Sequence, residues 1–144
     1  MTLPPPAQVL PHQPPMILID ELLASSDDSL SARVRLRDDS PFVEDGRVSS
    51  LVAIEYMAQT IAALAGLHKR ARGEPIKRGY LLGCRELKLP VAELRAGDEL
   101  TVRVRQTWTT EELGHFDCSV TRGEELVAAG VLSVYQGELP EETA

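Results

Sequence analysis

The stretch SLVAIEYMAQTIAALAGLH at residues 50–68 decides the fold of this chain. Its apolar side chains recur three and four residues apart, which is the spacing of one face of an α-helix. Ser49 or Ser50 can cap the first turn, and Gly73 with Pro75 ends the helix after a cluster of basic residues. The predicted helix is apolar around most of its circumference, so we expect a sheet to wrap it.

The residues on both sides of this helix have the alternating pattern of β-strands. Leu100, Val102 and Val104 alternate with polar side chains, which predicts a strand with one buried and one solvent-facing side. Strands before and after one buried helix predict the α+β class, with an antiparallel sheet wrapped around one long central helix. The predicted strands span 16–23, 32–36, 80–89, 99–108, 116–121 and 125–135, with a polar loop at 37–49 and a helical turn near 7–10.

The length and composition are those of one globular domain. The chain has 144 residues, of which 43% are hydrophobic and 26% are charged, so we predict a single domain over 1–144. We expect the Pro-rich segment 1–15 and the acidic tail 138–144 to be peripheral. The formal net charge of -7 argues against nucleic acid as a partner.

The sequence also argues against a membrane span, a secretory signal and a metal site. Polar residues such as Glu55 and Gln59 interrupt the longest apolar region, and no basic segment precedes an apolar one at the N-terminus. We therefore expect a cytoplasmic protein. Cys84 and Cys118 are too few for a disulfide framework and lack the paired spacing of zinc ligands, so we expect two packed thiols.

Two motifs, in the same order along the chain, resemble those of a known enzyme family. LPHQPPMILID at 10–20 resembles the opening Leu-Pro-His-Arg-x-Pro-x-Leu-Leu-x-Asp of bacterial 3-hydroxyacyl-acyl-carrier-protein dehydratases. IEYMAQ at 54–59 resembles their Glu-x-Met-Ala-Gln helix, and the likeness continues through GYLLG at 79–83 and LRAGDEL at 94–100. The residues of these motifs are most similar to those of the subgroup of dehydratases associated with aryl polyene and related pigment biosynthesis.

This resemblance implies a fold, a reaction and partners. The implied fold is a hotdog that forms a homodimer, or a heterodimer with another hotdog subunit, by edge-to-edge pairing of sheets. The implied reaction removes water from an (R)-3-hydroxyacyl thioester on acyl carrier protein, in fatty acid or aryl-polyene/polyketide-type biosynthesis. The substrate would be carried on phosphopantetheine, and no cofactor is expected.

The chain departs from the family in the loop before the helix. Ordinary dehydratases have their catalytic histidine there in a Gly-His-Phe-Pro-Gly loop, whereas the matching residues 40–48 here, SPFVEDGRV, contain no histidine. Only His12, His68 and His115 are present in the chain. His12 is the best candidate for a base, because the Pro-His segment of this family runs near the acyl tunnel; we expect the other two to be structural.

The implied reaction needs a base for the C2 proton, an acid for the departing hydroxyl and a donor to the thioester oxygen. We predict His12 as the base and Glu55 as the acid, with burial in the helix favouring the protonated carboxyl of Glu55. Backbone N–H groups at the helix start, around Ser50 and Leu51, are the predicted oxyanion donors. Gln59, one turn beyond Glu55, would orient its carboxyl.

Each of these residues also has a structural interpretation. Glu55 could reach solvent at a dimer seam, and His12 could cap the strand that follows it or hydrogen-bond a backbone carbonyl. Gln59 could be a packing residue with a satisfied amide. For His12 and Glu55 to form a site, their side chains must converge to within one water or substrate atom of each other.

Positive charge is concentrated in one part of an acidic chain. Between residues 69 and 88 the sequence carries a net charge of about +5, and we predict that this segment binds the phosphopantetheine phosphate and the acidic carrier protein. A solvated helix end is the structural alternative. The basic residues of this predicted patch are Lys69, Arg70, Arg72, Lys77, Arg78, Arg85 and Lys88.

The missing loop histidine leaves two other functions open. The chain could be a non-catalytic hotdog subunit that partners an active dehydratase or ketosynthase. It could also be an acyl thioesterase, because related hotdog enzymes use a helix carboxylate to direct water at the thioester. The Pro-His opening favours the dehydratase.

Overall fold

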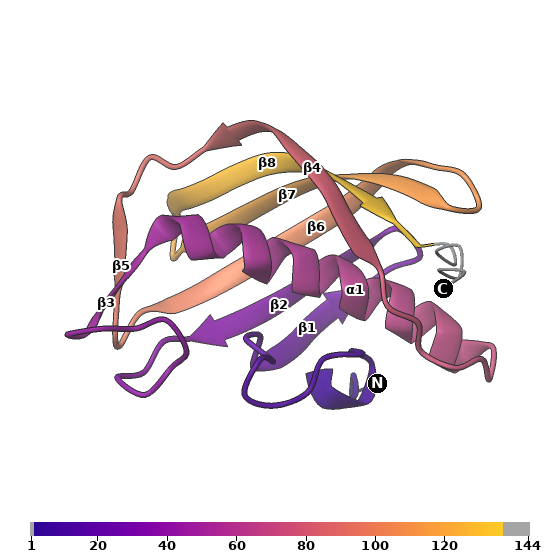
Figure 1. The fold of residues 1–144 in the computed structure, drawn as a ribbon, viewed down its shortest axis with the longest axis horizontal. Helices are drawn as coiled ribbons and strands as arrows, with labels where there is room; N and C mark the ends of the chain where they lie inside the picture. Colours follow the sequence, from indigo (N-terminus) through magenta and orange to yellow (C-terminus); the bar gives the residue numbers. More distant parts are fainter. Residues whose placement is uncertain (1, 137–144) are drawn as a thin grey trace, which may run out of the picture.

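Helix α1 (Ala53–Ala71) lies across one face of an antiparallel sheet, and the edge strand of that sheet passes over the helix (Figure 1). The computed structural model describes residues 2–136. The predicted arrangement of a sheet wrapped around one long helix is confirmed.

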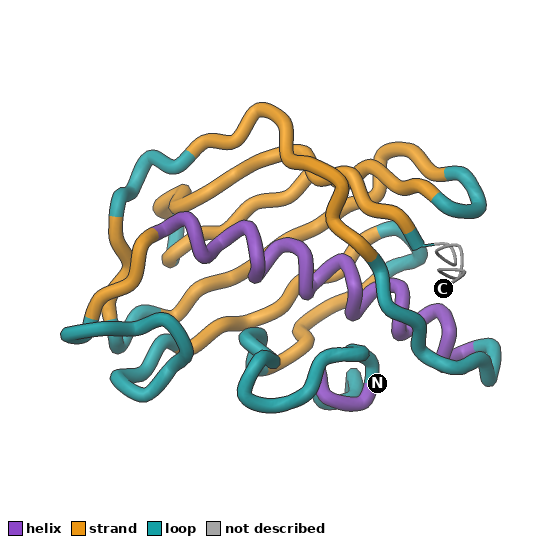
Figure 2. The backbone as a smooth tube through the Cα atoms, in the orientation of Figure 1, coloured by secondary structure: helices purple, strands orange, loops and turns teal. Residues whose placement is uncertain are grey.

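The main sheet has six strands in the order β1-β2-β6-β7-β8-β4, and all neighbouring strands are antiparallel. Two short strands, β3 and β5, form a separate two-stranded sheet beside the start of α1 (Figure 2). The strands are β1 (Glu21–Ser25), β2 (Ser29–Arg35), β3 (Arg47–Ser49), β4 (Tyr80–Lys88), β5 (Glu93–Arg95), β6 (Glu99–Thr109), β7 (Leu113–Arg122) and β8 (Glu125–Tyr135).

The strand register places the predicted apolar face against the helix. Ala32, Val102 and Val120 are direct cross-strand neighbours on β2, β6 and β7, and all three are fully buried. Arg103 lies one residue along β6, points to the opposite face and is exposed. The alternation in the sequence therefore gives the buried and exposed faces correctly, because side chains alternate along a strand.

The helix begins and ends close to the predicted limits. A 3-10 turn (Ser50–Val52) precedes α1, and the Ser49 side chain caps this turn by accepting a hydrogen bond from the Leu51 N–H. Gly73, with a left-handed φ of 67°, follows the helix end, where a residue without Cβ is favoured. Counted from Ser50 to Ala71, the helix has the length and hydropathy of a membrane span, but 56% of its apolar window is buried inside the fold. A core helix passes the same test, so this is weak evidence for a span.

The structure corrects the predicted first strand. β1 begins at Glu21 rather than at residue 16, because the Leu18 N–H donates to the Gln59 side chain on α1 instead of to a neighbouring strand. Leu18 and Ile19 are nevertheless buried, which is why residues 16–23 have the composition of a strand. The second strand, β2, begins three residues earlier than predicted.

Two further strands, β3 and β5, were not predicted from the sequence. The polar loop predicted at 37–49 contains β3, and β5 follows β4 where no strand was predicted. Each has three residues, and only Val48 and Leu94 at their centres are buried. A single buried residue gives no periodicity to detect.

The Pro-rich N-terminal segment, predicted to be peripheral, contributes buried residues to the core at Val9 and Leu10, whereas most of its other described residues are exposed or half-buried. It contains a 3-10 turn (Pro6–Gln8), and Val9 and Leu10 that follow are buried in the same apolar cluster as α1. Figure 1 shows this segment beneath the helix. The acidic tail predicted at 138–144 lies outside the described residues.

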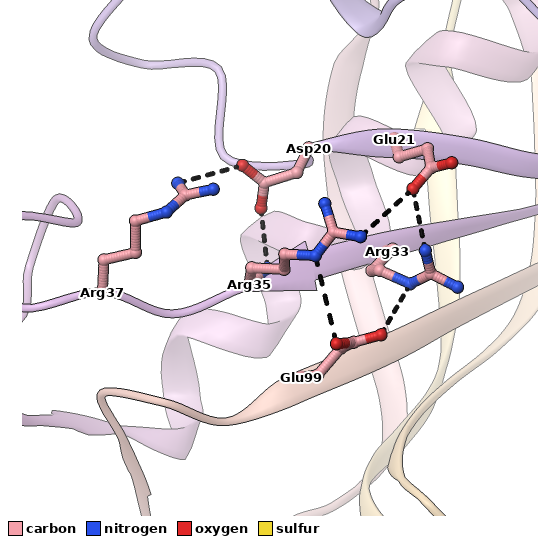
Figure 3. A network of polar contacts seen from close by, with 6 residues as sticks. All are labelled: Asp20, Glu21, Arg33, Arg35, Arg37 and Glu99. Atoms are coloured by element: carbon pink, nitrogen blue, oxygen red, sulfur yellow. Dashed lines mark hydrogen bonds and ion pairs between the residues drawn. The ribbon is translucent and has the colours of Figure 1, made fainter.

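Asp20 fixes the point where the N-terminal segment enters the sheet. Its carboxylate accepts a hydrogen bond of 2.7 Å from the Arg35 N–H and lies 3.5 Å from the Arg37 guanidinium (Figure 3). The neighbouring Glu21 and Glu99 both pair with Arg33. The exposed ion pairs contribute little stability each, whereas the hydrogen bond from the Arg35 N–H to the Asp20 carboxylate ties residue 20 to the end of β2.

Candidate active site

His12 and Glu55 converge, although 43 residues separate them in the sequence. The Nε2 atom of His12 lies 4.0 Å from the Oε1 atom of Glu55. Both side chains line a cavity of about 140 Å³ between α1, the start of β4 and the end of β8. The cavity is lined by His12, Glu55, Ala58, Ile61, Ala62, Gly79, Tyr80, Leu81, Val134 and Gln136.

Gln59 joins the carboxyl of Glu55 to the N-terminal segment. Its Nε2 donates hydrogen bonds to Glu55 Oε1 at 3.0 Å and to the Met16 carbonyl at 2.7 Å, and its Oε1 accepts from the Leu18 N–H at 2.8 Å. Gln59 is fully buried. The amide therefore contacts Glu55 as predicted, and it also holds the segment that carries His12.

One nitrogen of the His12 imidazole, Nδ1, is buried without a hydrogen bond to any of the described residues. Leaving a buried polar atom unpaired costs about 1–3 kcal/mol, so this nitrogen is a candidate for a contact with a bound molecule. The other two histidines lie elsewhere: His68 is in the last turn of α1, and His115 packs against Trp108 with ring centroids 4.8 Å apart and the ring planes tilted by 38°.

Glu55 is more exposed than predicted. Its side chain retains 42% of its accessible surface, and that of His12 retains 30%. Glu55 lies in the first turn of α1 and borders the cavity between α1, β4 and β8. This chain alone therefore does not provide the burial expected for the carboxyl.

The predicted oxyanion donors are already engaged. The Ser50 N–H donates to the Ala92 carbonyl at 3.0 Å, and the Leu51 N–H donates to Ser49 Oγ at 3.2 Å. An N–H group that is paired within the protein is not free to stabilise charge on a thioester oxygen. The prediction for Ser50 and Leu51 is therefore wrong for this structure.

Three residues of the predicted basic patch border the site. Lys69, Lys77 and Arg78 line a second, smaller cavity of about 40 Å³. This cavity shares Ala62, Gly79 and Gln136 with the cavity that contains His12 and Glu55, so the two adjoin. Cationic side chains therefore lie beside the candidate site, at the C-terminal half of α1.

The other four residues of the patch do not join them at this cavity. Arg70 donates a hydrogen bond of 2.7 Å to Gln8, and Arg72 pairs with Glu74, whose pKa is lowered chiefly by its hydrogen bond from Lys69. Arg85 and Lys88 follow on β4, which runs away from the end of the helix (Figure 1). An extended strand rises about 3.3 Å per residue, so Lys88 lies about 30 Å along the chain from Arg78.

Sequence reasoning missed Tyr80. It is the first residue of β4, and it is the only residue with a hydroxyl among those that line the cavity of His12 and Glu55. Its hydroxyl has no hydrogen-bond partner within residues 2–136. Tyr80 lies in the GYLLG motif at 79–83, which resembles the family. The alternating pattern of a strand does not show which cavity a residue at the start of that strand borders.

Comparison with solved structures identifies the fold. A chain of the dehydratase heterocomplex ApeI:P from Xenorhabdus doucetiae is similar with a TM-score of 0.90 and 30% identity, over 94% of this chain and 93% of that chain. A hypothetical thioesterase with coenzyme A from Streptococcus pneumoniae matches with a TM-score of 0.62 and 12% identity, over 84% of this chain and 88% of that chain. Zebrafish thioesterase superfamily member 2 matches with a TM-score of 0.62 and 11% identity, over 81% of this chain and 80% of that chain. The two thioesterases are evidence for the hotdog fold alone.

Comparison of sequences identifies the family. No curated protein matches the chain. The family model described as ApeP dehydratase matches residues 4–144, which is nearly the whole length. Together with the 30% identity to a chain of the ApeI:P heterocomplex, this match shows that the chain belongs to the ApeP-like dehydratase family.

Proposed function

We propose that this protein removes water from (R)-3-hydroxyacyl thioesters carried on acyl carrier protein, in fatty acid or aryl polyene biosynthesis. The observation that carries the proposal is the 4.0 Å approach of His12 Nε2 to Glu55 Oε1, with Gln59 bonded to the same carboxyl. A histidine and a carboxyl that line one cavity are the base and acid that this elimination needs. Membership of a dehydratase family supports the same reaction.

The two side chains divide the proton transfers between them. His12 Nε2 takes the C2 proton, and the electrons of the C2–H bond form the C2–C3 double bond as the C3–O bond breaks. Glu55 gives its proton to the leaving hydroxyl, which departs as water. The products are an enoyl thioester, a protonated His12 and a carboxylate at Glu55, and transfer of one proton from the imidazole to the carboxyl restores the starting state.

Gln59 determines which oxygen of Glu55 carries the proton. The amide donates to Oε1, so the proton of the neutral carboxyl belongs on Oε2. The other two hydrogen bonds of Gln59, to Met16 and Leu18, prevent the amide from reversing its donor and acceptor. The acid is thereby held in one orientation before the substrate binds.

Tyr80 replaces the helix N-terminus as the proposed hydrogen-bond donor to the thioester oxygen. During the elimination, negative charge develops on the thioester oxygen and must be stabilised by a hydrogen-bond donor. Tyr80 lines the cavity together with His12 and Glu55, and its hydroxyl has no hydrogen-bond partner within residues 2–136. We assign it as the donor to the thioester oxygen.

Lys69, Lys77 and Arg78 are the proposed docking residues for the carrier protein. They line the cavity that adjoins the candidate site, where the phosphate of a phosphopantetheine arm would enter. Attraction between these cations and an acidic carrier would speed encounter and orient the arm. In this proposal the thioester arrives on phosphopantetheine, and the two side chains perform the reaction without a cofactor.

A non-catalytic partner subunit is the second candidate function. It is favoured by the 42% exposure of Glu55 and by the small volume of the cavity, because both are features of a site that a second subunit covers. The structural relative from Xenorhabdus doucetiae is itself a heterocomplex. In this alternative, the chain forms part of a tunnel whose base and acid belong to another hotdog subunit.

Mass spectrometry of the carrier-bound product separates the candidates. The chain is incubated with 3-hydroxyacyl carrier proteins of several acyl lengths, and loss of one water from the intact acyl carrier is followed. Water loss by the chain alone supports the dehydratase. Release of free carrier thiol instead indicates a thioesterase, and no turnover with any acyl length indicates a partner subunit.

A further inference from the structure

The residues that carry His12 form a strap that packs along one side of α1. We define the strap as residues 6–20, from the first 3-10 turn to the start of β1. Apart from that turn it has no regular secondary structure, and it lies beneath the helix (Figures 1 and 2). His12 lies in the middle of the strap, so its position depends on how both halves of the strap are held.

Gly66 allows the first half of the strap to dock. A Cβ atom at Gly66 would lie 1.9 Å from the Val9 carbonyl oxygen and 2.8 Å from its carbonyl carbon. Both distances are too short for real contacts, and the atoms in the way are backbone atoms that cannot turn aside. Glycine in a helix interior costs about 1 kcal/mol relative to alanine. Here the absence of a side chain lets the Val9 backbone pack directly against the helix, and the burial of Val9, which is completely buried, offsets that cost.

Two polar contacts from the same helix complete the docking. Arg70 donates a hydrogen bond of 2.7 Å to Gln8, next to Val9, and Gln59 binds the backbone of Met16 and Leu18. His12 lies between these two attachments in the sequence. The backbone on both sides of His12 is therefore attached to α1, the helix that also carries Glu55.

We propose that Gly66 and the Arg70–Gln8 hydrogen bond are positioning elements that set the distance between His12 and Glu55. This inference rests on the proposed function, in which those two side chains are base and acid. The elements act through the strap and do not touch substrate. A displacement of the order of 1 Å at a reacting group can lower a rate by about 10²-fold, and a methyl group at residue 66 would displace Val9 by about that much.

A double-mutant cycle in activity tests the proposal. Gly66→Ala should lower kcat by on the order of 10²-fold in the wild-type background. In a His12→Ala background it should change the residual kcat by less than about twofold, because the group that it positions is gone. Equal losses in both backgrounds would show that Gly66 acts on general structure and would overturn the proposal.

The hydrogen bond gives a second variant in case Gly66→Ala does not fold. Arg70→Ala and Gln8→Ala should each lower kcat, and the double variant should lose no more than either single one, because both remove the same bond. Arg47→Ala is the matched control, since Arg47 is exposed on β3 and, among the described residues, its side chain pairs with Glu93 alone. If Arg47→Ala lowers kcat as much as Arg70→Ala, the assigned role of the bond is wrong.

An NMR measurement decides the inference independently of turnover. When Glu55→Gln is introduced into otherwise wild-type protein, the ring resonances of His12 should shift relative to the wild-type spectrum, because the two side chains are 4.0 Å apart. In Gly66→Ala the same substitution should shift them much less. A retained shift would overturn the positioning role. Absence of dehydratase turnover in the wild type would instead contradict the proposed function, and the NMR result would still decide whether Gly66 positions His12.

Discussion

Glu55 has its orientation fixed by a residue four positions further along the same helix. Positions i and i+4 are neighbours on a helix surface, so the contact between Gln59 and Glu55 follows directly from helical geometry. This part of the site was predictable from the sequence. The approach of His12 was not predictable in the same way, because it depends on the docking of a segment 43 residues away.

Replacing Tyr80 with phenylalanine tests its role as the donor to the thioester oxygen. Removal of one such donor typically lowers kcat by about 10²- to 10³-fold, and we expect Tyr80→Phe to do so with little change in stability. The measurement is steady-state dehydration of a 3-hydroxyacyl carrier protein, with circular dichroism as a check on folding. Tyr135→Phe is the control, because Tyr135 lies opposite Tyr80 on β8 and does not line the cavity. If Tyr80→Phe keeps the wild-type kcat, Tyr80 is not the donor to the thioester oxygen.

The two cysteines should differ sharply in reactivity. Burial raises the pKa of the Cys118 thiol to about 12, and it raises that of the less buried Cys84 as well. Because the thiolate is the reactive form, Cys118 should be protonated and unreactive at pH 8. We expect iodoacetamide to label Cys84 in the native protein and Cys118 only in urea, as read by peptide mass spectrometry. Labelling of Cys118 in native Cys84→Ser protein would contradict the structure of the core.

The wrong prediction for Ser50 and Leu51 has a specific physical cause. A helix start was expected to leave free N–H groups, which is generally correct. Here Ser49 caps one of these groups, and Ala92, in the loop before β5, accepts from the other. The cap is visible in the sequence, whereas the contact with Ala92 requires the tertiary structure.

At the scale of elements, α1 is the centre of the apolar core, and its buried face should dominate stability. Ile61 has 2% of its surface exposed, whereas Leu51 in the preceding 3-10 turn has 55% exposed. Ile61→Ala should lower the free energy of unfolding by about 2–5 kcal/mol, because it removes buried methyl groups and leaves a cavity. Leu51→Ala should change it by no more than about 0.5 kcal/mol. Urea denaturation measures both, and equal effects would mean that the helix face is assigned wrongly.

The elements differ in how well their sequences define them. The long periodic patterns of α1, β6 and β8 gave these elements nearly the correct limits. Residues 16–20 have a strand-like composition, yet their backbone bonds to Gln59 and they form the end of the strap. Buried segments outside a sheet have the same apolar composition as strands, so composition alone does not separate them.

At the scale of the whole molecule, β4 is an edge strand with an exposed apolar surface. Leu81 and Leu82 have 44% and 60% of their surface exposed, and β4 pairs only with β8 among the described residues. An unpaired apolar edge is a ready site for pairing with another chain. Since Leu81 also lines the cavity of His12 and Glu55, a subunit paired there would cover the exposed carboxyl.

An arginine at residue 82 should therefore weaken association. We expect the wild-type chain to sediment as a dimer, and Leu82→Arg to raise the dissociation constant by on the order of tenfold or more, which corresponds to at least about 1.4 kcal/mol. Leu126→Arg is the control, because Leu126 is 39% exposed at the start of β8, away from the β4 edge. A monomeric wild-type chain, or equal effects of the two substitutions, would contradict pairing through β4.

Conversion of 3-hydroxyacyl carrier protein to its enoyl form, by wild-type protein, His12→Ala and Glu55→Gln in parallel, tests the central claim most directly. The account predicts turnover by the wild type and a loss of about 10²- to 10⁴-fold in each variant, with folding intact, because each variant removes one proton-transfer group. Wild-type kcat in either folded variant would contradict the assignment of His12 and Glu55 as base and acid.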